Sequence, residues 1–287
     1  MGRIAASRQI AKDSWAVLRR ESDLVAIPIL SFVCTLATMA VVGLGVWASL
    51  EESTTDAAVA ASTGTTTELD VTPLTVVVGI VGYLLITVVV TFFAAAMVAG
   101  AHEALTTGST SLGRALRGAG RRIGPIIGWS LLTGTVGLVI QAVQERLGPF
   151  GDVVMSLVGA AWNIVTWLAV PVVVVEGTGP FPSLKRSAEL FKRTWGENLV
   201  AQGGLGLLTF LAVLAIVVVC GAIAVAIPLL GIGLGVLAIG ATLVVMSALG
   251  GIFRTALYLY AADGVVADGY SRPALESAFR VKSGRLR

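Results

Sequence analysis

The sequence has little charge. Asp, Glu, Lys and Arg together make up 13% of its 287 residues, about half of the share in an ordinary soluble domain, which is about 25%. Hydrophobic residues make up 56%, and the mean hydropathy is +0.90. This composition excludes a soluble globular domain and indicates a polytopic membrane protein.

Cysteine and histidine are also scarce, with two Cys and one His. Cys34 and Cys220 lie in separate apolar segments, so we expect no disulfide. A metal site would need further clustered ligands, and the sequence has no P-loop, G-x-S-x-G or H-E-x-x-H motif. We therefore expect no cofactor, no metal and no catalytic residue. The pair His102–Glu103 could shuttle protons, but a solvated histidine at a helix end is the favoured interpretation.

Six apolar runs are long enough to cross a bilayer as helices. The expected fold is therefore all-α, with six transmembrane helices arranged as three hairpins. The fifth and sixth runs are separated by Pro228 and nearby glycines, which predict a tight turn; a re-entrant pair is the alternative. The runs lie near residues 25–48, 74–100, 125–143, 153–175, 203–227 and 234–261.

Two segments outside the runs are also informative. Residues 49–73 are rich in Thr, Ala and Ser and contain no Lys or Arg, so we predict a disordered outer loop there. Residues 263–287 are predicted to form a cytoplasmic tail.

The basic residues are distributed asymmetrically. Nineteen of the twenty Lys and Arg residues fall on one side of the six-run pattern, and Arg146 is the exception. The positive-inside rule then places both termini in the cytoplasm of a protein in the plasma membrane. The isoelectric point near 9.1 does not indicate nucleic acid as a partner, because basic residues beside spans attract anionic lipid headgroups, with about 1 kcal/mol each.

The basic segments share a pattern. Residues 111–124 align without gaps with residues 183–196, and the leader around residues 11–20 fits the same register. In each segment apolar residues line one helical face and basic residues another. This predicts three copies of one unit, a cytoplasmic amphipathic helix with its apolar face in lipid followed by a hairpin. The common demands on interfacial helices could produce the same pattern without duplication.

Seven basic residues are expected to contact lipid headgroups. Six lie in the three amphipathic segments. The seventh lies near the cytoplasmic end of the last span, where a long side chain can reach the headgroups. They are Arg19, Arg20, Arg121, Arg122, Lys192, Arg193 and Arg254.

Three segments carry a family resemblance. They are SLKRSAELFKRTWGEN at residues 183–198, SWAVLRR at residues 14–20 and RTALY at residues 254–258. Together they resemble an uncharacterised family of six-span bacterial and archaeal membrane proteins. The resemblance implies an integral membrane domain of unknown function and transfers no catalytic or binding residues.

Three classes of function are compatible with these features. The first is a non-enzymatic membrane scaffold or accessory component that organises lipid or an unidentified membrane protein partner. The second is a permease for a neutral or apolar solute, with a path between the hairpins. The third is a lipid-modifying enzyme that uses His102, Glu103 and nearby arginines. No ionisable residue lies near the middle of a span, which argues against ion-coupled transport.

Overall fold

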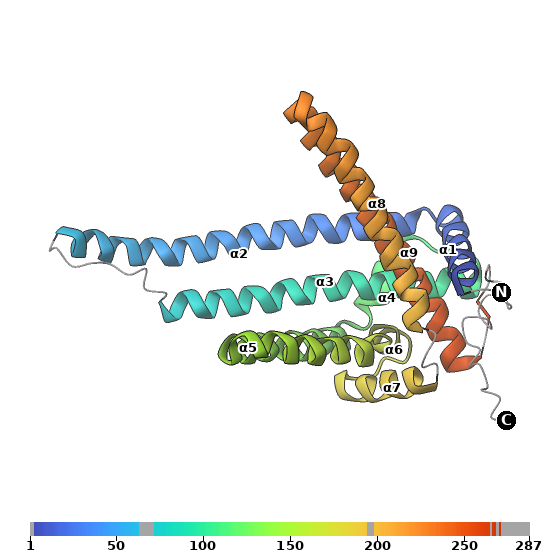
Figure 1. The fold of residues 1–287 in the computed structure, drawn as a ribbon. Coiled ribbons are helices and arrows are strands. Elements are labelled where there is room, and N and C mark those ends of the chain that lie inside the picture. Colours follow the sequence, from blue (N-terminus) through green and yellow to red (C-terminus); the bar gives the residue numbers. More distant parts are fainter. Residues whose placement is uncertain (1–2, 63–71, 194–197, 265, 268–269, 271–287) are drawn as a thin grey trace.

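The structure is a computed structural model and describes residues 3–62, 72–193, 198–264, 266–267 and 270 (Figure 1). These residues confirm the expected all-α class and contain six long apolar helical segments. The helices are α1 (Arg3–Arg20), α2 (Asp23–Ser62), α3 (Pro73–Thr107), α4 (Leu112–Gly120), α5 (Ile123–Thr166), α6 (Ala169–Val175), α7 (Pro180–Arg193), α8 (Asn198–Ala226) and α9 (Pro228–Asp263).

Each predicted span overlaps one helical segment that is long and apolar enough to cross a membrane, so the chain is a multi-pass membrane protein. These segments are Asp23–Leu50, Pro73–Thr107, Ile123–Leu147, Gly151–Val175, Leu208–Val225 and Pro228–Asp263.

The prediction of a disordered loop over residues 49–73 is wrong for its first half. Helix α2 continues to Ser62, because the segment after the span is rich in alanine and glutamate, which favour helix strongly. Helix α3 begins at Pro73 with Thr72 as its cap, whose hydroxyl accepts a hydrogen bond from the Thr75 backbone amide. Residues 63–71 lie outside the described residues.

Helix α5 bends back on itself, so that its two halves lie side by side. The Gln144 Nε2 donates a hydrogen bond to Asp152 Oδ1 at 2.8 Å, whereas eight residues of straight helix rise about 12 Å. Residues 135–140 and 158–165 also line one apolar cavity. The chain therefore turns back between Gln144 and Asp152, and the second half of α5 leads through Trp167 into α6.

The turn between α8 and α9 is tighter than expected. Only Ile227 separates the two helices, and Pro228 and the following glycines belong to α9. A side chain at Gly231 would collide with the backbone of Ala224 on α8, whereas Gly233 faces open space. Gly231 therefore allows the first turn of α9 to lie directly against α8.

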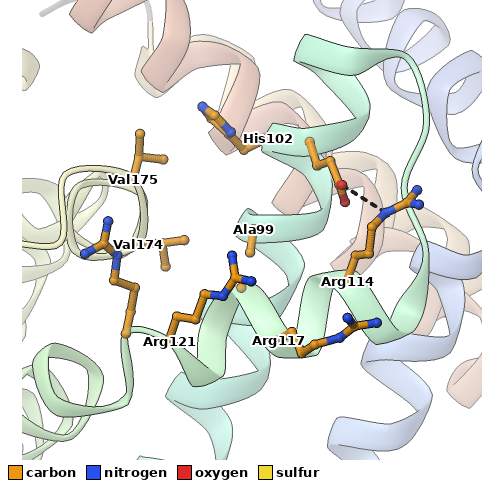
Figure 2. A pocket seen from close by; sticks show the side chains of 10 residues that line it. Ala99, His102, Arg114, Arg117, Arg121, Val174 and Val175 are labelled. Carbon is orange, nitrogen blue, oxygen red and sulfur yellow. Dashed lines mark ion pairs between the residues drawn. The ribbon is translucent and has the colours of Figure 1, made fainter.

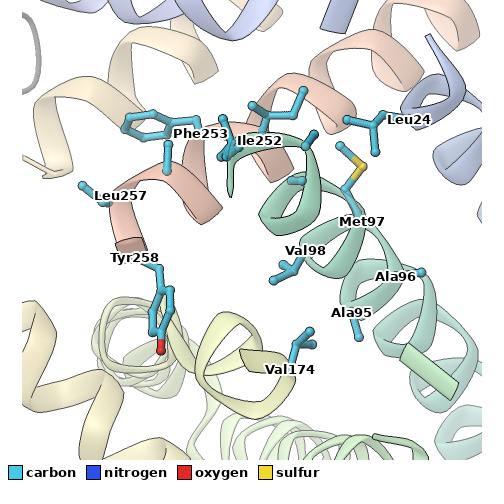
Figure 3. Close-up of a cluster of buried hydrophobic side chains, with 14 of the residues drawn as sticks. Leu24, Ala95, Ala96, Met97, Val98, Val174, Ile252, Phe253, Leu257 and Tyr258 are labelled. Carbon is cyan, nitrogen blue, oxygen red and sulfur yellow. The ribbon is translucent and has the colours of Figure 1, made fainter. Parts of the chain in front are cut away.

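The long helices meet at one end of the molecule. Helix α3 contacts α6 and α9, and α6 also contacts α9. Buried side chains such as Val98, Val172 and Ile252 fill the space between them, and Figure 3 shows part of this cluster. We call this end, where α1, α4 and α7 also lie, the basic end. Away from it the long helices spread apart (Figure 1).

The short helices α1, α4 and α7 each pack against long helices. Helix α4 packs against α3, helix α7 against α5 and α6, and helix α1 against α8 and α9. Their buried residues include Val17 and Leu18 of α1, Ala115 of α4, and Leu190 and Phe191 of α7. Protein therefore covers part of each short helix, whereas Trp15, on the predicted apolar face of α1, is 44% exposed; contact of these faces with lipid stays a prediction.

The close contact at Gly231 generates a prediction. Gly231→Val should lower the thermal stability of the detergent-solubilised protein by roughly 1–3 kcal/mol, as overpacking does in tightly packed interiors. Gly233→Val, two residues along the same helix, should change the melting temperature little. The measurement is thermal unfolding followed by circular dichroism, and equal melting temperatures for the two variants would contradict the packing of α8 on α9.

Candidate functional site: an arginine-lined cavity

A cavity of about 610 Å³ opens at the basic end between α3, α4 and α6 (Figure 2). Its charged lining comes from four arginines, His102 and Glu103. The arginines are Arg114, Arg117, Arg121 and Arg122, and the remaining walls are formed by Ala99, Gly118, Val174 and Val175.

Helix spacing and small side chains place these arginines. The hydroxyl of Ser111 accepts a hydrogen bond from the Arg114 backbone amide at 3.4 Å and caps α4. The spacing of Arg114, Arg117 and Arg121 puts their side chains on one face of the helix. On the opposite face Ala115 contacts Gly100 of α3, where an added Cβ would come within 2.9 Å of the alanine methyl. The close approach of the two helices holds the arginine face over the end of α3.

The charges around the cavity are not balanced. Arg114 Nε lies 2.9 Å from Glu103 Oε1, and the Thr110 hydroxyl donates to the other carboxylate oxygen of Glu103 at 2.8 Å. In the part of the chain that the structure describes, Arg117, Arg121 and Arg122 form no ion pair. The lining therefore has four guanidinium groups against one carboxylate, and that carboxylate is already paired.

The position of the Arg122 side chain depends on Gly177, which follows α6. Gly177, just after α6, adopts a left-handed conformation with φ of +68°, and the guanidinium of Arg122 occupies the place where a side chain at Gly177 would stand. Any other residue at this position would be strained and would also displace Arg122. The absence of a side chain at Gly177 thus leaves room for the Arg122 guanidinium at the edge of the cavity.

The corresponding position on α7 is neutralised. In the gapless alignment Arg186 matches Arg114, and Arg186 Nε lies 3.2 Å from Glu176 Oε1. The Tyr258 hydroxyl donates to the same oxygen at 3.0 Å. Where α4 has Arg117, α7 has Glu189. Arg186 is thus paired as Arg114 is, and the difference between the two helices is the acidic Glu189 at the position where Arg117 lines the arginine-lined cavity.

The structure brings together only part of the predicted set of headgroup contacts. Arg121 and Arg122 line the cavity. Arg19 and Lys192 are exposed elsewhere at the basic end, and Arg20 donates to the carbonyl oxygen of Ala104 at 3.4 Å. The side chain of Arg193 lies outside the described residues. Arg114 and Arg117 were not among the seven, although their spacing with Arg121 was a signal that could have found them.

Arg254 lies against an aromatic ring at the end of another helix. Its guanidinium carbon is 4.0 Å from the centre of the Trp167 ring, and its Nε is buried without a hydrogen-bond partner among the described residues. This face of α9 packs toward α3 and α6, and contact of Arg254 with lipid headgroups stays a prediction.

The fold and the cavity define a class, a multi-pass helical membrane protein with a cationic cavity at one end of the bundle. Within that class, the chain belongs to a family of unknown function, DUF6159, which matches over residues 74–268. The match covers every residue that lines the cavity and confirms the resemblance to an uncharacterised family. No curated protein and no solved structure matches the chain.

The contact between Arg122 and Gly177 can be tested with a matched pair. Gly264 has the same φ of +68°, but a side chain there would meet nothing within 4 Å. Gly264→Ala should cost about 1 kcal/mol of stability through backbone strain alone, whereas Gly177→Ala should cost more because Arg122 must also move. Thermal unfolding of both variants measures the difference. In an Arg122→Ala background the two costs should become equal, and a difference that persists there would show that Arg122 is not its cause.

Proposed function

We propose that this protein is a non-enzymatic membrane scaffold or accessory component that binds anionic lipid headgroups at its basic end, in the cytoplasmic leaflet of the plasma membrane. The observation that carries the proposal is the arginine-lined cavity, in which Arg117, Arg121 and Arg122 have no acidic partner among the residues that the structure describes. Guanidinium groups recognise phosphate oxygens through paired hydrogen bonds. A lipid headgroup supplies such oxygens at the depth where membrane spans end.

The expected orientation, with both termini in the cytoplasm, has support from a contact between the two ends of the chain. The hydroxyls of Ser14 on α1 and Tyr270 after α9 lie 2.6 Å apart. Burial raises the pKa of the Tyr270 phenol, in keeping with its enclosed position against α1. The segments nearest both termini therefore lie on one side of the long helices, the side that is rich in basic residues.

An internal threefold repeat accounts for several features. We take each unit to be a hairpin of long helices together with the short helix that packs on it: α2–α3 with α4, α5–α6 with α7, and α8–α9 with α1. Buried positions coincide in the sequence alignment of the short helices, since Ala115, Ser187 and Ser14 are equivalent and all buried. In this arrangement α1, although first in the chain, completes the last unit.

The ends of the three hairpins support the same repeat. In the described part of the chain, positive φ angles occur at Gly108, Gly177 and Gly264. Each follows the last long or short helix of one hairpin, namely α3, α6 and α9. A left-handed glycine is a common way to end a helix, but its recurrence at the equivalent point of each unit favours duplication over chance similarity.

The packing at the basic end favours the scaffold over the two alternatives. A permease path along the axis between hairpins calls for a polar track, whereas apolar side chains of α3, α6 and α9 fill this axis at the basic end. A lipid-modifying enzyme needs a nucleophile or a free base. Glu103 is instead paired with Arg114 and hydrogen-bonded by Thr110. His102 also lines the cavity, but the lining contains no Ser, Thr or Cys nucleophile.

The proposal predicts a charge-specific loss of lipid binding. The triple variant Arg117→Gln, Arg121→Gln, Arg122→Gln should bind phosphatidylglycerol more weakly by up to roughly a hundredfold, because each basic residue near a membrane surface contributes about 1 kcal/mol. Native mass spectrometry of the protein released from mixed micelles of phosphatidylglycerol and phosphatidylcholine measures the retained lipid.

A matched control removes the same charge elsewhere at the basic end. Lys12, Arg19 and Lys192 are exposed and lie outside the cavity, so their triple change to Gln should weaken binding much less. Equal losses in the two variants would mean that diffuse surface charge, and not the cavity, attracts the lipid.

A further inference from the structure

A second cavity lies between α2, α3 and α9, with a volume of about 290 Å³. It is separate from the arginine-lined cavity and shares no lining residue with it. Its walls are mostly apolar, but they include the hydroxyl-bearing residues Ser31 and Ser247 and the side chain of Arg254. It therefore combines an apolar enclosure with one strong cationic donor.

Arg254 is partly buried, and its buried Nε has no hydrogen-bond partner among the described residues. None of the described residues forms an ion pair with it. The face of Trp167, 4.0 Å away, attracts the positive charge but accepts no conventional hydrogen bond. A guanidinium has five N–H donors, and a charge within a membrane span is costly and marks function. An anion in the cavity would supply the negative charge and the hydrogen-bond acceptor that the described residues do not provide.

On the proposed internal repeat, the positions equivalent to Arg254 are apolar. Counting ten residues back from the left-handed glycines Gly108, Gly177 and Gly264 gives Val98, Trp167 and Arg254. These three equivalent positions meet in the structure, since Val98 lines the cavity with Arg254 and Trp167 stacks on the guanidinium. Two of the three are apolar, so packing alone would be satisfied by an apolar residue at position 254.

The cavity has room for a small group beside Arg254. A Cβ built at Gly250 meets nothing within 4 Å, so this glycine leaves the cavity open on the α9 side. A volume of about 290 Å³ equals that of roughly ten water molecules, enough for a phosphate or carboxylate and the first atoms attached to it. The outward faces of α2 and α9 beyond the cavity are apolar, with Phe32 62% and Leu243 51% exposed. An acyl chain can pack against these faces.

We propose that this cavity binds the oxyanion of an acyl lipid, with Arg254 holding the anionic group and the chain lying along α2 and α9. Ser31 and Ser247 line the same cavity and offer hydroxyl donors. This site differs from the arginine-lined cavity in depth and selectivity. One buried guanidinium in apolar surroundings favours a single negative charge attached to a hydrocarbon chain, whereas the exposed cluster favours any anionic headgroup.

The test uses the full-length protein in a neutral detergent and titrates phosphatidylglycerol, a long-chain fatty acid and inorganic phosphate as separate probes. Native mass spectrometry counts the bound molecules. The unmodified protein should retain one acyl anion at least tenfold more tightly than Arg254→Met does. The variant Arg117→Gln, Arg121→Gln, Arg122→Gln should keep this binding event, which separates it from binding at the other cavity.

Because Arg254→Met could disturb folding, a second variant fills the cavity without touching the arginine. Gly250→Leu should also weaken retention at least tenfold, whereas Gly240→Leu, ten residues earlier on α9 and likewise open, should bind as the unmodified protein does. Unchanged binding in folded Gly250→Leu would overturn the site. Equal affinity for inorganic phosphate would overturn the role of the acyl chain, and the contrast between phosphatidylglycerol and fatty acid identifies which oxyanion is preferred.

Discussion

At the basic end, α3, α6 and α9 pack against one another through small and apolar side chains, and the other described helices depend on that contact. Helices α2, α5 and α8 are held as partners of the three inner helices, and the short helices α1, α4 and α7 cover their ends. In a membrane, where lipid is as apolar as the helix surfaces, such association needs close packing and not simply hydrophobicity. Gly251 of α9, where an added Cβ would come within 2.5 Å of the Met97 side chain of α3, is one place where this close packing occurs.

The same packing determines where charge can accumulate. Because α4 lies close against α3, its arginines project over the end of α3 with only Glu103 to balance them. Because α9 turns one face toward α3 and α6, Arg254 is carried inside the bundle and onto Trp167. Two cationic sites at different depths thus arise from one set of helix contacts, one open at the surface and one enclosed by apolar walls.

The sequence predicted the features that depend on local composition. Span lengths and the positions of the basic residues follow from hydropathy and charge along the chain, and six spanning segments were expected where six are found. Contacts between distant segments were not predictable in this way. The packing of α1 on α8 and α9, which follow it by about 180 residues or more, buries Val17 and Leu18 of a helix that the sequence alone assigned to the lipid interface. Arg254 was placed at the membrane surface because its depth was judged from distance along one helix, whereas its environment is set by two others.

The central claim is that Arg117, Arg121 and Arg122 form a binding site for an anionic headgroup. The most direct test is an experimental structure of the protein in nanodiscs that contain phosphatidylglycerol, with a bound antibody fragment to add mass for electron cryo-microscopy. The account predicts headgroup density in the arginine-lined cavity, with phosphate oxygens about 3 Å from at least two of these guanidinium groups. A cavity that is closed by the protein's own acidic side chains, or that contains no lipid density when lipid is resolved elsewhere around the bundle, would contradict it.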